Sequence, residues 1–325
     1  MKRWIFLFPL LMALGYANRI QASCGASICP LDLHKSVQAG RLQFTLSHEY
    51  INQNRINVGS EKSFVGALPN PHDEVKTINQ RALLQVQYGI SNSFGISVEL
   101  PFIIREHRHI EESVLEVFCF EGFGDVSVSG QYGFNFGSPI SPARLDFSAG
   151  IKAPTGLMDA ENEKGEQAEA TIQPGTGSWD GILGAYLQIP LFTVPGISGG
   201  LYSNLPLNAG ISYRLNGKGM DDYKFGNQLL AHIGTEYQML PHLSLLFFAN
   251  GRWQDFAEVG TTGEFRSNTG GTYIFASPGL SLHFTTALSA YSYAQVPVYQ
   301  KVNGIQQVVK LNWQVGLSAN VNLLQ

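Results

Sequence analysis

The last strand-like run of this chain, from Lys310 to Leu323, alternates apolar and polar residues without a break. Its odd positions carry Leu, Trp, Val, Leu, Ala, Val and Leu, whereas its even positions carry Lys, Asn, Gln, Gly, Ser, Asn and Asn. Successive side chains of a β-strand point to opposite faces, so one face of this strand is wholly apolar and the other is polar or glycine. The strand therefore needs an apolar environment on one side and water on the other.

The same alternation recurs in weaker form along the chain. It predicts about 12 strands, an even number that suits two chain ends on one side of a membrane. The predicted strands lie at about 41–51, 77–90, 94–102, 125–134, 144–153, 183–189, 204–214, 227–238, 243–256, 272–283, 286–297 and 308–323.

The connections between these strands alternate in length. The short ones lie at 91–93, 137–142, 194–199, 239–242 and 284–285. The long ones lie at about 53–76, 105–121, 156–177, 215–226, 257–271 and 298–307. Short periplasmic turns that alternate with long external loops are typical of outer-membrane barrels, and soluble β-sandwiches show no such regular alternation.

The first 22 residues have the features of a secretory signal peptide. Lys2 and Arg3 precede an apolar segment from Trp4 to Leu14, and Ala22 is a plausible last residue before cleavage. The apolar segment is too short for a membrane anchor. We therefore divide the chain into a signal peptide (1–22), an N-terminal periplasmic or lumen segment (23–40) and an outer-membrane barrel (41–325).

Composition supports a barrel in the cell outer membrane. Only 14% of residues are charged, 44% are hydrophobic, and no stretch beyond the signal approaches the length of an apolar membrane-spanning helix. Strands in a membrane can pair all of their backbone groups only if they close into a barrel. The composition therefore predicts an all-β, membrane-spanning, antiparallel up-and-down barrel. The formal net charge of −4 argues against nucleic acid as a partner. The expected partners are outer-membrane lipid, the barrel-assembly machinery and a small-molecule solute.

The chain contains three cysteines, Cys24, Cys29 and Cys119. Export permits disulfides, and we favour a Cys24–Cys29 bridge that closes a small N-terminal loop. Cys119 is then free or belongs to an alternative pairing. The 23–40 segment, with or without the bridge, could enter the barrel as a plug.

Three local motifs stand where predicted strands meet long loops. They are Gly122-Phe-Gly-Asp125, Ala153-Pro-Thr-Gly156 and Pro174-Gly-Thr-Gly-Ser-Trp-Asp180. Together they resemble a family of outer-membrane barrels named after the meta-pathway of phenol degradation, which is distantly similar to fatty-acid transporters. The resemblance covers roughly residues 77–325 and implies a transporter without a defined substrate. The C-terminal Leu-Leu-Gln departs from the terminal Phe or Tyr of most such barrels.

The motifs also have a structural interpretation. Their glycines permit positive φ where a strand turns into a loop. Asp125, Thr155 and Asp180 can bond exposed backbone groups at the same place. The acid-rich stretch 159–164 reads as a solvated loop, with contact to a ligand or a gate as the alternative.

Histidines in two predicted external loops suggest a speculative metal site. His107 and His109 share one face if the chain is extended there, and His72 could supply a third ligand for zinc or copper. Arg108 between the two histidines lowers metal affinity, so an ordinary hydrated loop is the alternative. No cofactor is expected.

Alternation assigns ten charged or titratable side chains to the lumen, because Arg or Lys on the lipid face costs about 2–4 kcal/mol at the bilayer midplane. These side chains could knit the wall together or form a selectivity filter. They are Arg81, Glu99, Asp125, Arg144, Asp146, Lys152, Arg214, His232, Glu236 and Arg252.

These patterns favour a channel that passes small solutes by passive diffusion through a narrow polar lumen. The alternative is a surface binding or scaffold barrel whose His-rich external loops bind metal or a partner. An outer-membrane hydrolase is less favoured, since no histidine begins the His-x-Ser-Asn-Gly motif of outer-membrane phospholipases. Two histidines, His34 and His242, are followed two residues later by serine, but neither sequence continues with Asn-Gly. We therefore expect no enzyme activity.

Overall fold

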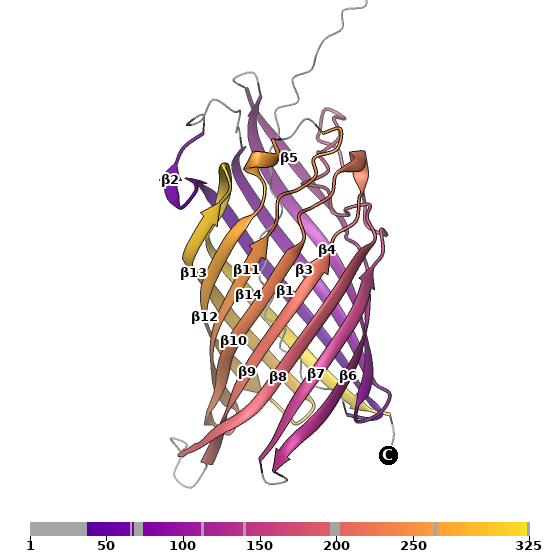
Figure 1. Ribbon diagram of the computed structural model, residues 1–325, viewed down its shortest axis with the longest axis vertical. Coiled ribbons are helices and arrows are strands. Elements are labelled where there is room, and N and C mark those ends of the chain that lie inside the picture. Colours follow the sequence, from indigo (N-terminus) through magenta and orange to yellow (C-terminus); the bar gives the residue numbers. More distant parts are fainter. Residues whose placement is uncertain are drawn as a thin grey trace, which may run out of the picture.

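The computed structural model describes residues 38–65, 67, 74–111, 114–138, 141–195, 202–262 and 265–323, which form a closed antiparallel barrel (Figure 1). The N-terminal expectations, namely the signal peptide, the plug and the Cys24–Cys29 bridge, lie outside the described residues, as does His72. No helix in the described part of the chain has the length and hydropathy needed to cross a membrane.

The barrel wall has 12 strands, as the alternation predicted. Strands that follow one another in this set are neighbours in space, which makes the topology up-and-down. The wall strands are β1 (Arg41–Val58), β3 (Glu74–Gly89), β4 (Phe94–Glu111), β6 (Ser127–Ser138), β7 (Ser141–Lys152), β8 (Asp180–Pro195), β9 (Tyr202–Leu215), β10 (Gln228–Leu240), β11 (Leu243–Gln254), β12 (Gly271–His283), β13 (Leu288–Val302) and β14 (Ile305–Asn322).

The last strand closes the barrel on the first. β14 pairs with β1 over nearly their whole lengths, from Arg41 opposite Asn322 to Val58 opposite Ile305. Closure pairs the edge strands that would otherwise expose backbone groups to lipid. The two ends of the wall also meet through the backbone, since the N–H of Leu323 donates to the carbonyl of Gly40 at 2.8 Å.

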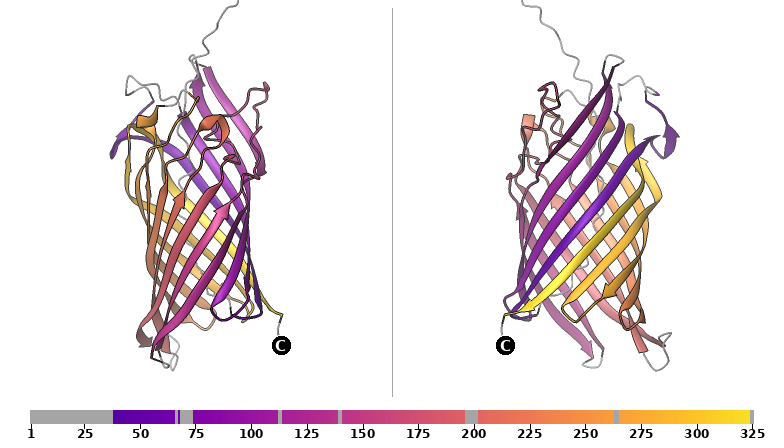
Figure 2. Two further views of the ribbon diagram at one scale, coloured as in Figure 1. Left: turned by 45° about the vertical axis from the view of Figure 1, so that its right-hand side comes forward. Right: turned by 180° about the vertical axis from the view of Figure 1, so that it is seen from behind.

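The two ends of the barrel differ, as the connection lengths predicted, but the expectation of a long loop at 298–307 was wrong, since β13 and β14 extend through it to a short turn at 303–304. We call the two ends the short-turn end, where β14 ends, and the long-loop end, where longer connections gather (Figures 1 and 2). Two additional strands lie at the long-loop end, the short β2 (Glu61–Ser63) on β1 and β5 (Val114–Phe123) on β4. Two single-turn 3₁₀ segments, Met220–Asp222 and Arg266–Asn268, belong to connections at this end.

The outer surface of the wall is apolar over most of its height. Alternate residues of the strands expose large apolar side chains, so their burial requires hydrocarbon around the barrel. Examples from around the wall are Leu46, Leu84, Val98, Phe147, Leu183, Ile211, Ile233, Phe247, Leu280 and Leu317. The odd-numbered residues of the C-terminal run, from Leu311 to Val321, face outward as their alternation predicted.

The expectation of a loop at 105–121 was wrong. β4 continues to Glu111, and β5 pairs with it from Phe102 opposite Phe123 to Glu111 opposite Val114. The alternation gives no signal here because the outward face is no longer apolar. Glu106 and Arg108 take outward positions, which carry lipid-facing apolar residues in the earlier part of β4. We call this extension the β4–β5 hairpin.

Candidate functional site

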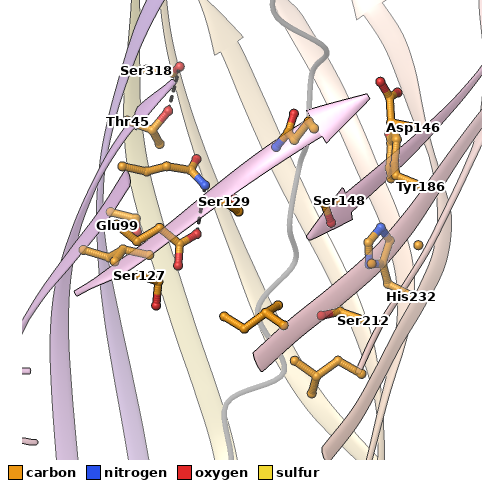
Figure 3. Close-up of a pocket in the computed structure, with 18 of the residues that line it drawn as sticks. Thr45, Glu99, Ser127, Ser129, Asp146, Ser148, Tyr186, Ser212, His232 and Ser318 are labelled. Atoms are coloured by element: carbon orange, nitrogen blue, oxygen red, sulfur yellow. Dashed lines mark hydrogen bonds between the residues drawn. The ribbon is translucent and has the colours of Figure 1, made fainter. Parts of the chain in front are cut away.

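The barrel encloses a cavity of about 230 Å³, which we call the lumen cavity. Inward side chains from every wall strand contribute to it (Figure 3). Six of the ten predicted lumen residues line this cavity: Arg81, Glu99, Asp146, Arg214, His232 and Glu236. A cavity of this size accommodates a small solute, since sites for larger organic ligands measure about 300–1,000 Å³.

One wall of the lumen cavity is polar and hydrogen-bonded. Arg81 donates from Nε and Nη2 to the two carboxylate oxygens of Glu49, each at 2.9 Å, across the β1–β3 pair. Gln85 donates to Glu99 at 3.0 Å, and Thr45 lies 3.1 Å from Ser318. Such pairs join neighbouring strands while their charges still face the cavity.

The facing wall is richer in apolar and aromatic side chains. The imidazole of His232 lies between two rings, with centroid distances of 6.0 Å to Tyr186 and 6.3 Å to Phe248. Leu230 and Leu246 also line the cavity, so the expectation of a mostly polar interior holds for one wall only. Figure 3 shows Tyr186, Ser212 and His232 on one side, and Thr45, Glu99 and Ser318 on the other.

The remaining four predicted lumen residues do not line the lumen cavity. Arg144 donates to Asp146 and also to the backbone carbonyl of Asn92, near the short-turn end. The guanidinium of Arg252 lies over the ring of Tyr273, 4.5 Å from its centroid. Asp125 and Lys152 belong to a separate buried network.

This network, the Lys152 network, fastens the β7–β8 connection to the barrel interior. Lys152 Nζ lies 2.7 Å from Asp125 Oδ2 and 2.9 Å from Asp180 Oδ2, and it donates to the hydroxyl of Thr176. Asp125 accepts the backbone N–H of Gly156 at 2.9 Å and that of Thr176 at 2.9 Å. All three charged side chains are almost fully buried, so removing one of them would leave an uncompensated buried charge.

The three sequence motifs meet in the Lys152 network. Their acids bond backbone groups as predicted, and the hydroxyl of Thr155 accepts the N–H of Val126 at 2.9 Å. The expectation of positive φ for the motif glycines was wrong except at Gly177, where φ is +70°. Gly156 and Gly175 instead lie so close that a Cβ on Gly175 would come within 2.6 Å of the Gly156 backbone.

The β7–β8 connection is only partly the solvated loop that its acids suggested. Its stretch 159–167 is largely exposed, whereas 168–175 is mostly buried. Ala168 and Ile172 pack on Phe118 of the β4–β5 hairpin, and Arg105 donates to the carbonyl of Ile172. The connection therefore folds into the long-loop end of the barrel.

A second apolar cluster joins three connections at this end. Ala170, Tyr223 and Ala257 are buried against one another, and they come from the β7–β8, β9–β10 and β11–β12 connections. The connections also share backbone bonds, such as those between Lys224 and Glu258. We call this assembly, at the long-loop end of the barrel, the cap.

The pH dependence of the cap follows from Asp125, which lies in the connection between β5 and β6. Burial is the largest effect and raises its pKa, but Lys152 and the donors of Thr176 together outweigh burial and hold the pKa below its ordinary value of 3.8. A carboxyl with a depressed pKa stabilises the fold fully above its ordinary pKa, and this stabilisation is lost as pH falls through the lower value.

We therefore expect the amide hydrogens of 168–175 to stay protected from neutral pH down to about 3.8, and to lose protection below it. Hydrogen-exchange mass spectrometry, corrected for the intrinsic exchange rate, measures this. Asp125→Asn is expected to give weaker protection without the acid step. An unchanged acid step in this variant would assign the transition to another group.

The predicted metal ligands are only partly brought together. His107 and His109 share a face of β4, with ring centroids 5.4 Å apart. His107 Nδ1 lies 2.8 Å from the hydroxyl of Thr77, and His109 Nε2 lies 3.7 Å from Glu116. Among the described residues, no three His, Cys, Asp or Glu side chains converge as metal ligands. Cys119 is exposed with a free thiol.

Comparison with known proteins bears on the fold. No protein-family model and no curated sequence matches the chain. The barrel is similar to an outer membrane channel from Pseudomonas putida F1, with a TM-score of 0.61 and 13% identity over 90% of this chain and 100% of the channel. At this identity the likeness shows the fold alone: this chain has the fold of an outer-membrane barrel.

Two further structures overlay less well. The transport unit of the Escherichia coli autotransporter AIDA-I has a TM-score of 0.46 and 10% identity, covering 91% of this chain and 94% of that one. A Pseudomonas aeruginosa FadL homologue has a TM-score of 0.39 and 9% identity, covering 87% and 90%. Neither TM-score is high enough to support an argument about this chain.

Proposed function

We propose that this protein is an outer-membrane channel through which small solutes diffuse passively. The observation that carries the proposal is the pairing of an apolar outer surface with a lumen cavity lined by charged and hydroxyl side chains. Hydrocarbon outside and water inside are the conditions that a membrane channel requires. The motif resemblance to the phenol meta-pathway barrels points the same way.

The route through the barrel is narrow. Solutes reach the lumen cavity from the short-turn end, and the cap lies at the other end. Passage then requires either a path beside the β7–β8 connection or its displacement. Transport through such a channel would be passive, so the expected flux follows the concentration gradient.

The placement of the chain in the cell follows from this function. A signal peptide at 1–22 would direct export, and the barrel-assembly machinery would insert the barrel into outer-membrane lipid. The short-turn end then faces the periplasm and the cap faces outward. The segment 23–40 would lie in the periplasm or the lumen.

Glu99 is the residue we choose to test the channel. Glu99→Gln keeps a side-chain oxygen as an acceptor for Gln85 but removes one lumen charge. A unit charge about 4 Å from a passing ion is worth about 1 kcal/mol in water, so cation preference over anions should fall about two- to fivefold. The reversal potential across a planar bilayer in a KCl gradient measures this ratio.

The control for this experiment is Glu61→Gln, which removes an exposed charge on β2 outside the lumen. It should leave the reversal potential unchanged. A wild-type barrel that inserts but shows no stepwise current would overturn the channel proposal, whereas equal reversal potentials in wild type and Glu99→Gln would remove only the filter role.

The hydrolase alternative has one candidate cluster near the short-turn end. His283 Nε2 lies 3.3 Å from Glu236 and 3.5 Å from the hydroxyl of Ser244. Both contacts end on the same ring nitrogen, whereas a catalytic histidine contacts its serine and its acid through different nitrogens. We therefore favour a channel over an enzyme. For the metal-binding scaffold, the paired His107 and His109 are the feature to test by zinc titration.

A further inference from the structure

Arg214 is a cation in the lumen whose charge has no partner among the described residues. It stands on β9 and lines the lumen cavity half-buried. The other arginine of the lining, Arg81, is held by Glu49 through two hydrogen bonds. Within the described part of the chain, Arg214 makes no ion pair or side-chain hydrogen bond. Its guanidinium fork is therefore available to an anion, and carboxylates match this fork in a bidentate manner.

The acids around Arg214 are already occupied. Asp180 is the next inward-facing residue of β8 on the cap side of Ile182, which lies opposite Arg214. The carboxylate of Asp180 contacts Lys152 at 2.9 Å and accepts hydrogen bonds from the hydroxyl of Ser178 at 2.8 Å and from the N–H of Gly217 at 3.0 Å. Asp146 is paired with Arg144 at 2.8 Å, and Glu236 lies 3.3 Å from His283. Glu99 stands on β4, four strands round the wall from β9. None of these acids neutralises Arg214.

A hollow lies next to Arg214 on the same wall. Across the strands, Arg214 is opposite Ile182 of β8, and the next inward row contains Gly184, Ser212 and Leu230. Glycine and serine make this row shallow, although the hydroxyl of Ser148 lies over Gly184, 2.5 Å from where a Cβ would stand. Ile182 and Leu230 give the row apolar sides. Inward rows repeat every two residues, which is about 7 Å along a strand. The hollow is therefore about as long as one six-membered ring.

Aromatic rings close the far side of the hollow. The following inward row contains Tyr186, Gly210 and His232, with the two rings on either side of the glycine. The imidazole lies so close over Gly210 that a Cβ there would come within 2.3 Å of it. Tyr186 is fixed by a hydrogen bond from its hydroxyl to Asn208 at 2.8 Å. The hollow thus has a cation at one end, apolar sides and ring surfaces at the other end.

We propose that this hollow, the Arg214 subsite, binds a small monocarboxylate with an aromatic or branched aliphatic body. The carboxylate pairs with the guanidinium of Arg214, and the body lies over Ser212, beside the hydroxyl of Ser148 and against Leu230 and the rings. The proposal rests on the proposed function only in that the solute must reach the lumen. A sugar would leave the apolar sides unsatisfied, and a dicarboxylate would bring its second charge to the ring end.

Isothermal titration of the detergent-solubilised barrel with sodium benzoate tests the subsite. We expect saturable binding that weakens tenfold or more in Arg214→Gln, because the charge-assisted bidentate contact is lost. Benzyl alcohol, which has the same ring without the charge, should bind at least tenfold more weakly than benzoate to wild type. Arg214→Lys keeps the charge but not the fork and should give an intermediate affinity.

Two further variants separate the subsite from general charge effects. Lys218→Gln removes an exposed cation from the connection that follows β9 and should not change benzoate affinity. Leu230→Ser should weaken benzoate more than acetate, since only benzoate has a body in the hollow. Heat-modified mobility on a gel confirms that each variant is folded.

The outcomes separate this proposal from the proposed function. No saturable heat with benzoate, or equal affinity in wild type and Arg214→Gln, would overturn the subsite even if the barrel conducts ions. Saturable benzoate binding that Arg214→Gln weakens would support the subsite even if no current is seen. Binding in detergent does not depend on conductance, so each result bears on one claim.

Discussion

Replacing Lys152 by methionine is expected to release the β7–β8 connection from the barrel and to open the long-loop end. Lys152 is the only cation that the structure places between the buried carboxylates of Asp125 and Asp180. Removing one partner of a buried ion pair costs about 3–5 kcal/mol, since the remaining charge is left without compensation. The open form of the connection should therefore become at least about a hundredfold more populated.

Two measurements follow this opening. A protease specific for glutamate should cut the acid-rich stretch 159–167 faster in Lys152→Met than in wild type. The single-channel conductance should rise, or the channel should be open for a larger fraction of the time. The barrel strands should persist, because the Lys152 network fastens the connection and not the wall. Equal cleavage rates and equal conductance in both proteins would show that the network does not hold the cap.

Two controls make the test specific. Lys224→Met removes a lysine that pairs with Glu258 at 2.7 Å on the surface of the same cap, where water replaces the lost partner. This variant should cleave like wild type. A triple variant, Asp125→Asn with Lys152→Met and Asp180→Asn, leaves no orphan charge. It should therefore open less than Lys152→Met alone.

The wall of this barrel was predictable because lipid imposes a strict rule on it. Every second residue of a membrane strand faces lipid and must be apolar. The predicted strands, their number and their outward faces therefore agree with the structure. The rule ends where the strands leave the hydrocarbon. β1 was predicted to end near 51 but continues to Val58, and the β4–β5 hairpin was predicted as a loop.

The lumen was less predictable because its residues meet by register and not by periodicity. Glu49 lies on the predicted polar face of the first strand, yet only the pairing of β1 with β3 shows that it holds Arg81. The apolar part of the lumen lies partly in the run Leu245 to Phe248, where both faces are apolar and alternation gives no signal. Leu246 and Phe248 point inward from this run.

The Lys152 network shows a different limit. Apart from Lys152, which directly precedes the second motif, its residues stand in the three motifs that the sequence singled out, so the motifs were informative about place. Their partnership was not, because it depends on strand register: Lys152 at the end of β7 lies opposite Asp180 at the start of β8, and Asp125 comes just before β6 on the other side of β7. A rim role was predicted for the two acids, and a lumen role for Lys152 and also for Asp125. The observed role is to hold a connection inside the barrel.

Replacing Leu317 by arginine is expected to destabilise the barrel strongly, and this tests the assignment of its outer face to hydrocarbon. Leu317 is exposed on β14 between Leu46 and Ala290 of the neighbouring strands. It stands roughly 17 Å of strand, or about 13 Å of barrel height at the usual tilt, from the short-turn end. That height is about half of a 25 Å apolar band, where arginine costs about 2–4 kcal/mol.

The measurement is the free energy of unfolding in lipid vesicles, from urea titration followed by tryptophan fluorescence. The matched variant is Ser318→Arg, one residue further along β14, whose side chain points into the lumen cavity beside Thr45. Water is available there, so the loss should stay below about 1 kcal/mol. If Ser318→Arg destabilised the barrel more than Leu317→Arg, the wet and lipid-facing sides would be reversed. The channel and the Arg214 subsite both require the lumen to be wet and the outer face of the wall to lie in hydrocarbon, because both place charged side chains in the lumen.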